Sequence, residues 1–227
     1  QAQIIGLERF GDEIKSPLGQ GLPGRLHRRI SGDDDHLGPV RPRDDLLQDL
    51  YTVDFIHSDA DAVWLRNPIP DYFSDPTCDI VASQGTIWPP DILRTQGFVF
   101  CCGFFYVRSC TATRALLDDM VNDVAVSGDD QVSLNRVIQS RGIHWETAQS
   151  HSYPLVHDGE QFLCFKHTLI GRSADGKLTV ALLPHHLFQR LHMPGQNAFV
   201  KHLLCEKTAG SKLDMFAQTD SRFLRPD

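Results

Sequence analysis

Residues 55–65 of this chain read FIHSDADAVWL, an apolar run that ends in two aspartates separated by one residue. The run predicts a buried β-strand, and alternate side chains of a strand point to the same face. Asp59 and Asp61 are therefore expected to lie side by side where the strand ends. Carboxylates placed in this way are ligands that Mg²⁺ and Mn²⁺ prefer. The pattern predicts a divalent metal site, with a solvated strand-to-loop corner as the alternative.

Strand and helix patterns alternate along the rest of the sequence. Apolar runs predict strands over residues 79–83, 98–107, 178–183 and 198–200. Helical spacing predicts helices over residues 115–121 and 130–138, and a short helix is expected over residues 43–50. Gly103 predicts a bend or bulge in its strand. We expect residues 1–227 to form one α/β domain, with a mostly parallel mixed sheet flanked by helices.

The N-terminal part, residues 1–50, is the least regular, because Gly, Pro and Arg are frequent there and an acidic run follows at residues 33–35. Such a composition is typical of surface loops. No apolar stretch is long enough to cross a bilayer, and Gln1 does not begin a signal peptide. Membrane attachment is therefore expected only through an anchor upstream of Gln1.

Net charge and cysteine spacing exclude two classes of site. A net charge of −7 argues against a nucleic-acid binder, which neutralises phosphates with a basic surface. None of the six cysteines forms a CxxC pair, so a thiolate zinc site is not expected. Cys101 and Cys102 lie in an apolar run, which predicts small buried hydrophobic residues.

Residues 59–68, DADAVWLRNP, resemble the DxDVVWLRDP signature of nucleotide-diphospho-sugar transferases of the plant cell-wall xylosyl- and arabinosyltransferase type. Further elements similar to that family follow in the expected order: DIVASQ at 79–84, GFFYVR at 103–108, DDQVSLN at 129–135, LLP at 182–184 with Phe188, and VKH at 200–202 with Gly210 and Lys212. The resemblance covers residues 53–216.

This resemblance implies a GT-A (Rossmann-like) glycosyltransferase that uses Mn²⁺ or Mg²⁺. The donor would be a nucleotide sugar, a UDP-sugar, and the acceptor a glycan or glycoprotein modified with retention of configuration. Asp59 would lie near the ribose and the metal, Asp61 would bind the metal, and His202 would be its third ligand. Lys212, with Gly210 before it, would meet the diphosphate. The resemblance also implies the Golgi lumen as the compartment.

Asp130 and Gln131 match the family segment that lines the sugar and the acceptor. Departure of a diphosphate leaves negative charge, which a divalent cation and a lysine stabilise. The sugar becomes cationic, so we expect Gln131 to support its positive face and Asp130 to orient hydroxyl groups. The alternatives are a structural histidine at position 202, a solvated Lys212, and aspartates at 129 and 130 that only open a helix.

Two other functions fit parts of the sequence. The hhhhDxDx[TV] motif of haloacid-dehalogenase-type phosphatases also fits residues 59–63, with Asp59 as nucleophile, Asp61 as acid/base and residues 124–130 as a later acidic motif. That class needs a lysine between the motifs, and none occurs between Lys15 and Lys166.

A nucleotide- or glycan-binding relative without turnover is the second alternative. Cys101 stands where the family often has asparagine, and residues 203–205, LLC, follow His202 where the family has a small or amide residue.

Overall fold

The computed structural model describes residues 3–7, 53–74, 77–146 and 151–204, together with Ser211, Asp214, Met215 and Ala217. The helix expected over residues 43–50 lies outside the described residues, and so do the expected ligand-binding residues Gly210 and Lys212. Among the helices of the described part, none combines the length and the apolar character that crossing a membrane requires.

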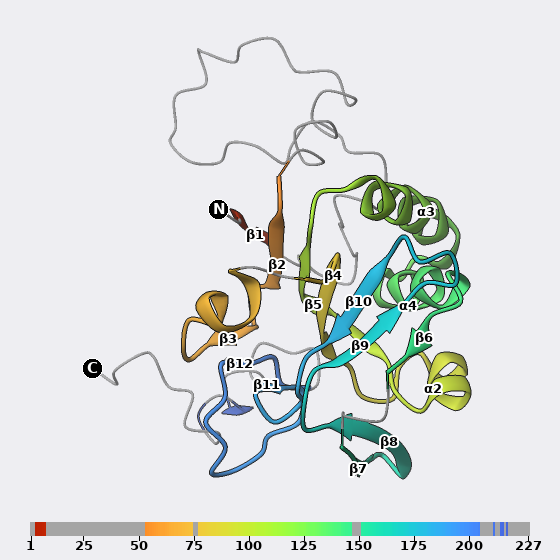
Figure 1. Cartoon of the computed structure of the whole chain (residues 1–227). Helices are drawn as coiled ribbons and strands as arrows, with labels where there is room; N and C mark the ends of the chain where they lie inside the picture. Colours follow the sequence, from red (N-terminus) through yellow and green to blue (C-terminus); the bar gives the residue numbers. More distant parts are fainter. Residues whose placement is uncertain are drawn as a thin grey trace, which may run out of the picture.

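A seven-stranded mixed sheet forms the centre of the described structure (Figure 1). In spatial order its strands are β1 (Gln3–Leu7), β2 (Phe55–Asp59), β5 (Phe100–Val107), β4 (Ile80–Gln84), β10 (Thr179–Leu182), β9 (Leu169–Arg172) and β6 (His144–Trp145). Strands β5 and β9 run against the other five, so only the pairs β1–β2 and β4–β10 are parallel. The expected α/β class with a mixed sheet is confirmed, but neighbouring strands pair more often antiparallel than expected. One reason is the short connection between β9 and β10, residues 173–178. Two consecutive parallel strands need a crossover of about a dozen residues or more, so β9 and β10 must pair antiparallel.

Three helices lie beside this sheet: α2 (Pro90–Gln96), α3 (Thr111–Ser127) and α4 (Asp130–Ser140) (Figure 1). The apolar faces of α3 and α4 pack against β4, β5 and β10 through Leu116, Met120, Leu134 and Ile138. Both helices were expected, but α3 begins earlier than its apolar spacing predicts. The Thr113 hydroxyl accepts a hydrogen bond from the Cys110 backbone N–H at 3.1 Å and so caps the first turn.

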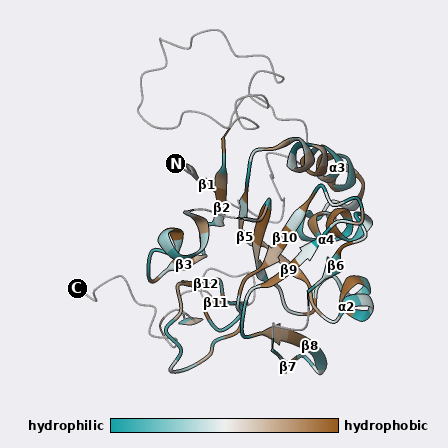
Figure 2. Cartoon of the chain, in the orientation of Figure 1, coloured by the Kyte–Doolittle hydropathy of each residue, from teal (hydrophilic) through white to brown (hydrophobic). Residues whose placement is uncertain are grey.

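The other face of the sheet is covered by a smaller sheet and a short helical segment. The elements are β11 (Phe188–Gln189), β12 (Val200–Lys201), β3 (Val63–Trp64) and η1 (Ile69–Phe73). Phe73 and Phe188 pack on Phe104 of β5, at 6.0 Å and 5.6 Å between ring centroids. Alternate β5 residues point to opposite faces, so Phe105 joins the helix side. Figure 2 shows the resulting apolar colouring of the central strands, and a hairpin of β7 (Ser152–His157) and β8 (Glu160–Phe165) forms a separate sheet.

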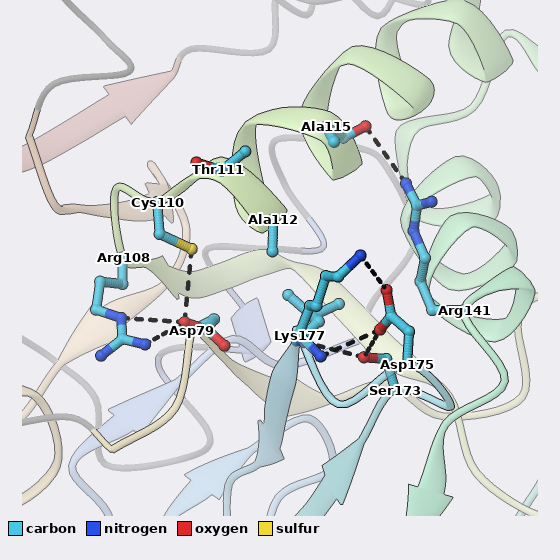
Figure 3. Close-up of a pocket in the computed structure, with 11 residues that line it drawn as sticks. Asp79, Arg108, Cys110, Thr111, Ala112, Ala115, Arg141, Ser173, Asp175 and Lys177 are labelled. Carbon is cyan, nitrogen blue, oxygen red and sulfur yellow. Dashed lines mark hydrogen bonds and ion pairs between the residues drawn. The ribbon is translucent and has the colours of Figure 1, made fainter.

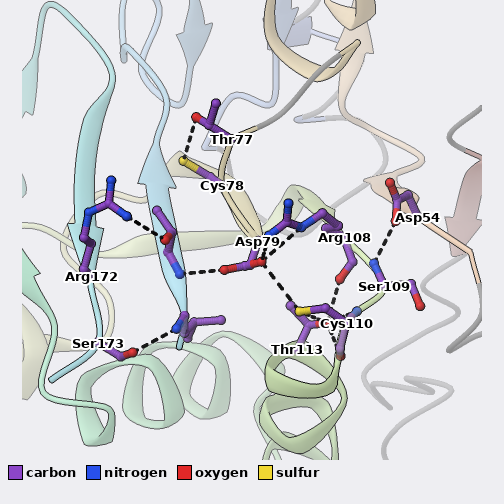
Figure 4. A network of polar contacts seen from close by, with 12 residues as sticks. Asp54, Thr77, Cys78, Asp79, Arg108, Ser109, Cys110, Thr113, Arg172 and Ser173 are labelled. Atoms are coloured by element: carbon purple, nitrogen blue, oxygen red, sulfur yellow. Dashed lines mark hydrogen bonds and ion pairs between the residues drawn. The ribbon is translucent and has the colours of Figure 1, made fainter. Parts of the chain in front are cut away.

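A buried carboxylate, Asp79, joins three strands at one end of the central sheet (Figure 4). Its Oδ1 accepts from Arg108 Nε at 3.0 Å, just after β5, and its Oδ2 accepts from the Thr179 N–H of β10 at 2.7 Å. Asp79 precedes β4, whereas Asp59 ends β2, and these two strands run the same way. The Asp79 network therefore lies at the opposite end of the sheet from Asp59.

Candidate metal centre

The three side chains expected to bind a metal come together at the end of β2. Asp59 is the last residue of β2, Asp61 lies in the turn that follows, and His202 comes directly after β12. His202 Nε2 lies 3.5 Å from Asp59 Oδ2 and 3.3 Å from Asp61 Oδ1. One ligand atom from each residue lies within 4.8 Å of the other two. Two carboxylates and one imidazole are a donor set that suits Mn²⁺, and the carboxylates also suit Mg²⁺.

Backbone pairing brings these distant parts of the chain together. A turn closed by the hydrogen bond from the Ala62 N–H to the Asp59 carbonyl, at 3.0 Å, carries the chain from β2 into β3. Strand β3 then pairs antiparallel with β12, with Val63 opposite Lys201. The same register continued by one residue places His202 opposite Ala62, next to Asp61. The pairing of β3 with β12 is therefore what adds the imidazole to the two carboxylates.

The centre is enclosed on its histidine side and open on its carboxylate side. The His202 side chain is 9% exposed, compared with 13% for Asp59 and 21% for Asp61. Burial and the nearby Arg190 disfavour a charged imidazole, but Cys101 and the hydrogen bond to Asp61 outweigh them and raise the pKa of His202. Two carboxylates this close favour a positive neighbour, which a protonated imidazole or a cation provides.

Cys101 contacts the metal centre instead of serving only as the small hydrophobic residue that the sequence suggested. Its Sγ lies 3.5 Å from His202 Nδ1 and accepts a hydrogen bond from the Gly103 N–H at 3.4 Å. Burial alone would raise the pKa of this thiol, but Arg190 and His202 lower it to about 6. A partner on Nδ1 fixes the ring so that Nε2 faces the carboxylates, as in metal sites whose histidines are held from behind.

Gly103 leaves the space in which the ligands meet. A Cβ atom at this position would lie 2.0 Å from His202 Cε1 and 2.6 Å from Asp59 Oδ2, distances that no packed structure permits. The register of β5 against β4 shifts between Ala82 and Gln84, which confirms the irregularity expected at Gly103. Glycine at position 103 therefore allows the ligands to meet, and it lies where the register of β5 against β4 shifts.

Two neighbours of the centre were not identified from the sequence. His57 Nε2 lies 3.2 Å from Asp59 Oδ1, so the carboxylate is oriented with Oδ2 toward His202. The alternation of side chains in a strand offered a signal for His57, because it shares a face with Asp59. Arg190 donates to the His202 carbonyl. No pattern around residue 190 predicts this contact, because β11 is only two residues long.

Gln131 lies against the strand segment that carries Cys101 and Gly103. Its Oε1 accepts from the Cys102 N–H at 3.4 Å, and its Nε2 donates to the Trp88 carbonyl at 2.7 Å. Asp130 lies beside it, half-buried in the first turn of α4. Asp129 opens the helix as the alternative interpretation suggested, since its carboxylate accepts from the Val132 N–H at 2.9 Å.

Hydrogen bonds of the buried Gln189 link the metal centre to the wall of a pocket of about 420 Å³. The Gln189 carbonyl accepts from the His202 N–H at 2.9 Å, and its side chain donates to the carbonyl of His186 at 3.1 Å. The pocket is lined by Tyr153, Lys166, His167, His186, Met193 and Gln196. This lining contains a lysine and two histidines and no carboxylate, so its charge suits a polar or anionic ligand.

A larger pocket, of about 610 Å³, lies around Asp79 at the other end of the sheet (Figure 3). The cations of its lining are each paired with a carboxylate: Arg108 with Asp79, Arg141 with Asp119, and Lys177 with Asp175. Because these charges are already compensated and none of the expected site residues lines the pocket, it is not part of the candidate site.

The phosphatase interpretation does not fit the observed elements. Its later acidic motif was placed at residues 124–130, yet residues 124–127 form the end of α3 and Asp129 caps α4. Asp59, the nucleophile of that scheme, lies instead beside two histidines, His57 and His202.

Comparison with known families agrees with this geometry. The family of nucleotide-diphospho-sugar transferases matches residues 41–216, which include Asp59, Asp61 and His202. No curated protein and no solved structure is significantly similar to the chain. A match that spans most of the chain, together with three candidate ligands in one place, leads to one conclusion. The chain belongs to the nucleotide-diphospho-sugar transferase family.

Proposed function

We propose that this protein transfers a sugar from a nucleotide-diphosphate sugar, a UDP-sugar, to a hydroxyl group of a glycan or glycoprotein. Family membership suggests a glycosyltransferase, and one observation supports metal dependence in particular. Asp59, Asp61 and His202 come from segments far apart in the sequence, yet their ligand atoms lie within 4.8 Å of one another. Mn²⁺ or Mg²⁺ is the cation we propose for this centre.

The residues in and around the centre have different proposed roles in binding the donor. When bound, the cation supplies positive charge that stabilises the diphosphate as it leaves. Asp59 and Asp61 would hold it with His202, and their partly exposed carboxylates are within reach of a ligand from solution. Cys101 and His57 orient two of these ligands from behind. Lys212 is proposed to meet the same diphosphate, from its position in the family pattern.

Gln131 is proposed to face the sugar that is transferred. It lies against the β5 segment whose Cys101 contacts His202, so a sugar attached to the diphosphate would lie close to it. Its amide oxygen would support the positive charge that develops on the ring. Asp130, in the same helical turn, would orient a hydroxyl of the donor or the acceptor. We propose attack on the face from which the diphosphate leaves, which retains the anomeric configuration.

A thermal-shift experiment tests the proposed donor site. UDP, GDP and ADP are each added with Mn²⁺ or with EDTA to the wild type, to Asp61→Ala and to Asp71→Ala. Asp71 is an exposed aspartate of η1 and serves as the control. UDP with Mn²⁺ is expected to stabilise the wild type and Asp71→Ala by about 3 kcal/mol at a hundredfold excess over Kd, and Asp61→Ala much less.

Two outcomes would contradict the proposal. If no nucleotide raises the melting temperature, the protein has no nucleotide-sugar site of the kind described. If UDP and Mn²⁺ stabilise it through Asp61 but no UDP-sugar is transferred or hydrolysed, the protein is a binding relative without turnover.

A further inference from the structure

Trp88 is an exposed aromatic side chain in a loop that is otherwise largely buried. It is 50% exposed, whereas Gln84 and Thr86 before it and Pro89 after it are buried. The other large apolar side chains that are exposed in the described part are aliphatic: Val126, Val156 and Leu204. Tryptophan is enriched at binding surfaces, because its indole offers a large apolar face and a polar N–H in one side chain.

The ring is held in place by the first turn of α4. Trp88 Nε1 donates to Asp129 Oδ2 at 3.2 Å, and the other oxygen of this carboxylate accepts from the Val132 N–H. The Trp88 carbonyl accepts from Gln131 Nε2 at 2.7 Å. Side chain and backbone are thus both fixed by the segment 129–131, and the ring is ordered before any ligand arrives.

Trp88 is linked to the metal centre through Gln131. The Gln131 amide spans from the Trp88 carbonyl to the Cys102 N–H, and the residues on either side of Cys102 contact His202 and face Asp59. Hydrogen bonds therefore connect Trp88 to Gln131, and Gln131 to the segment of β5 that borders the metal centre. Counted in hydrogen bonds, Trp88 is one residue further from the metal centre than Gln131, the residue proposed to face the donor sugar, and this favours a role for Trp88 toward the acceptor.

We infer that Trp88 is the platform on which a neutral sugar ring of the acceptor glycan stacks. This inference deepens the proposed transferase function and rests on it in identifying the ligand as the acceptor. The apolar C–H face of a pyranose packs against a flat indole, while the hydroxyl groups of the ring remain free for hydrogen bonds. With the indole edge tied to Asp129, the exposed part of the ring is left for this contact.

The experiment measures oligosaccharide binding without nucleotide or metal. Xylo-, cello-, arabino- and galacto-oligosaccharides are titrated into the protein by calorimetry and by tryptophan fluorescence. For the oligosaccharide that binds, the affinity of Trp88→Ala should fall about fivefold to tenfold, because a stacked ring contributes about that much. Trp88→Phe keeps a flat face and should bind within about threefold of the wild type, but without the fluorescence change. Val126→Ala, which removes exposed apolar surface from α3, should bind normally.

Three outcomes would overturn the inference. These are no oligosaccharide binding by the wild type, equal affinity in Trp88→Ala and the wild type, and an equal loss of affinity in Val126→Ala. If Trp88→Ala does not fold, the affinity and fluorescence of Trp88→Phe decide, because a fluorescence change that persists in that variant excludes stacking on Trp88. Failure of the transferase proposal is distinguishable, because it appears in the UDP and Mn²⁺ titration and leaves oligosaccharide binding unchanged.

Discussion

Among the individual residues, the metal centre depends on one that contributes no side chain. Gly103 was expected to bend its strand, and it does lie where the register of β5 shifts. Its closer role, the space that it leaves for His202 and Asp59, could not be inferred from the sequence, because His202 lies far along the chain and no local pattern joins the two. Asp59 and Asp61 were accessible to prediction because they are two residues apart in the sequence, although Asp61 lies in the turn after β2 and not in the strand itself.

Replacing Gly103 by alanine should therefore weaken metal binding strongly. The new Cβ would overlap the His202 ring and the Asp59 carboxylate, and one of these ligands must move away. Mn²⁺ binding followed by electron paramagnetic resonance should weaken by about tenfold to a hundredfold, the effect of disturbing the orientation of a ligand. The control is Gly176→Ala, where the new Cβ meets open space and only backbone strain at φ +71° is added. Wild-type Mn²⁺ affinity in Gly103→Ala would show that the ligands do not meet as described.

Among the helices and strands, local pattern predicted those with a long apolar face. Leu116, Leu117 and Met120 have helical spacing, and the helix they predict is part of α3. Strands β3 and β12 have two residues each, which is too short for any period to appear. Their pairing, which brings His202 to the aspartates, depends on tertiary contacts that the sequence does not display. The direction of β5 and β9 was likewise hidden, because strand patterns carry no direction.

The first turn of α4 is where we expect turnover to be most sensitive. Gln131→Ala should lower kcat for sugar transfer by about a hundredfold while UDP and Mn²⁺ binding stays unchanged, because Gln131 is proposed to act on the sugar and not on the diphosphate. Steady-state kinetics with a UDP-sugar and calorimetry with UDP separate these effects. Gln139→Ala, on the exposed part of the same helix, is the matched control. Unchanged kcat in Gln131→Ala would remove its assigned role.

In the molecule as a whole, a buried histidine makes stability depend on pH. His185 is fully buried, and within the described structure neither ring nitrogen has a hydrogen-bond partner. Burial, with some help from His186 and Arg190, lowers its pKa to about 4. An unfolded chain takes up this proton near pH 6.5, so the neutral ring favours folding above that pH and the benefit is lost as pH falls toward 4.

The free energy of unfolding should therefore fall by about 2 kcal/mol between pH 7 and pH 5 through this residue alone. Urea unfolding at the two pH values measures the change. His185→Phe should show a smaller difference between them, whereas His144→Gln, at an exposed position, should behave as the wild type. An equal pH dependence in His185→Phe and the wild type would assign the effect to other groups.

The pairing of β3 with β12 also determines when the metal centre can exist. All seven strands of the central sheet, and both aspartates, precede β12 in the sequence and are therefore synthesised before it. The imidazole of His202 is the last of the three ligands to be synthesised. A chain that stops short of β12 would contain every strand of the central sheet and both aspartates but lack the third ligand, so metal binding would report that synthesis has passed β12.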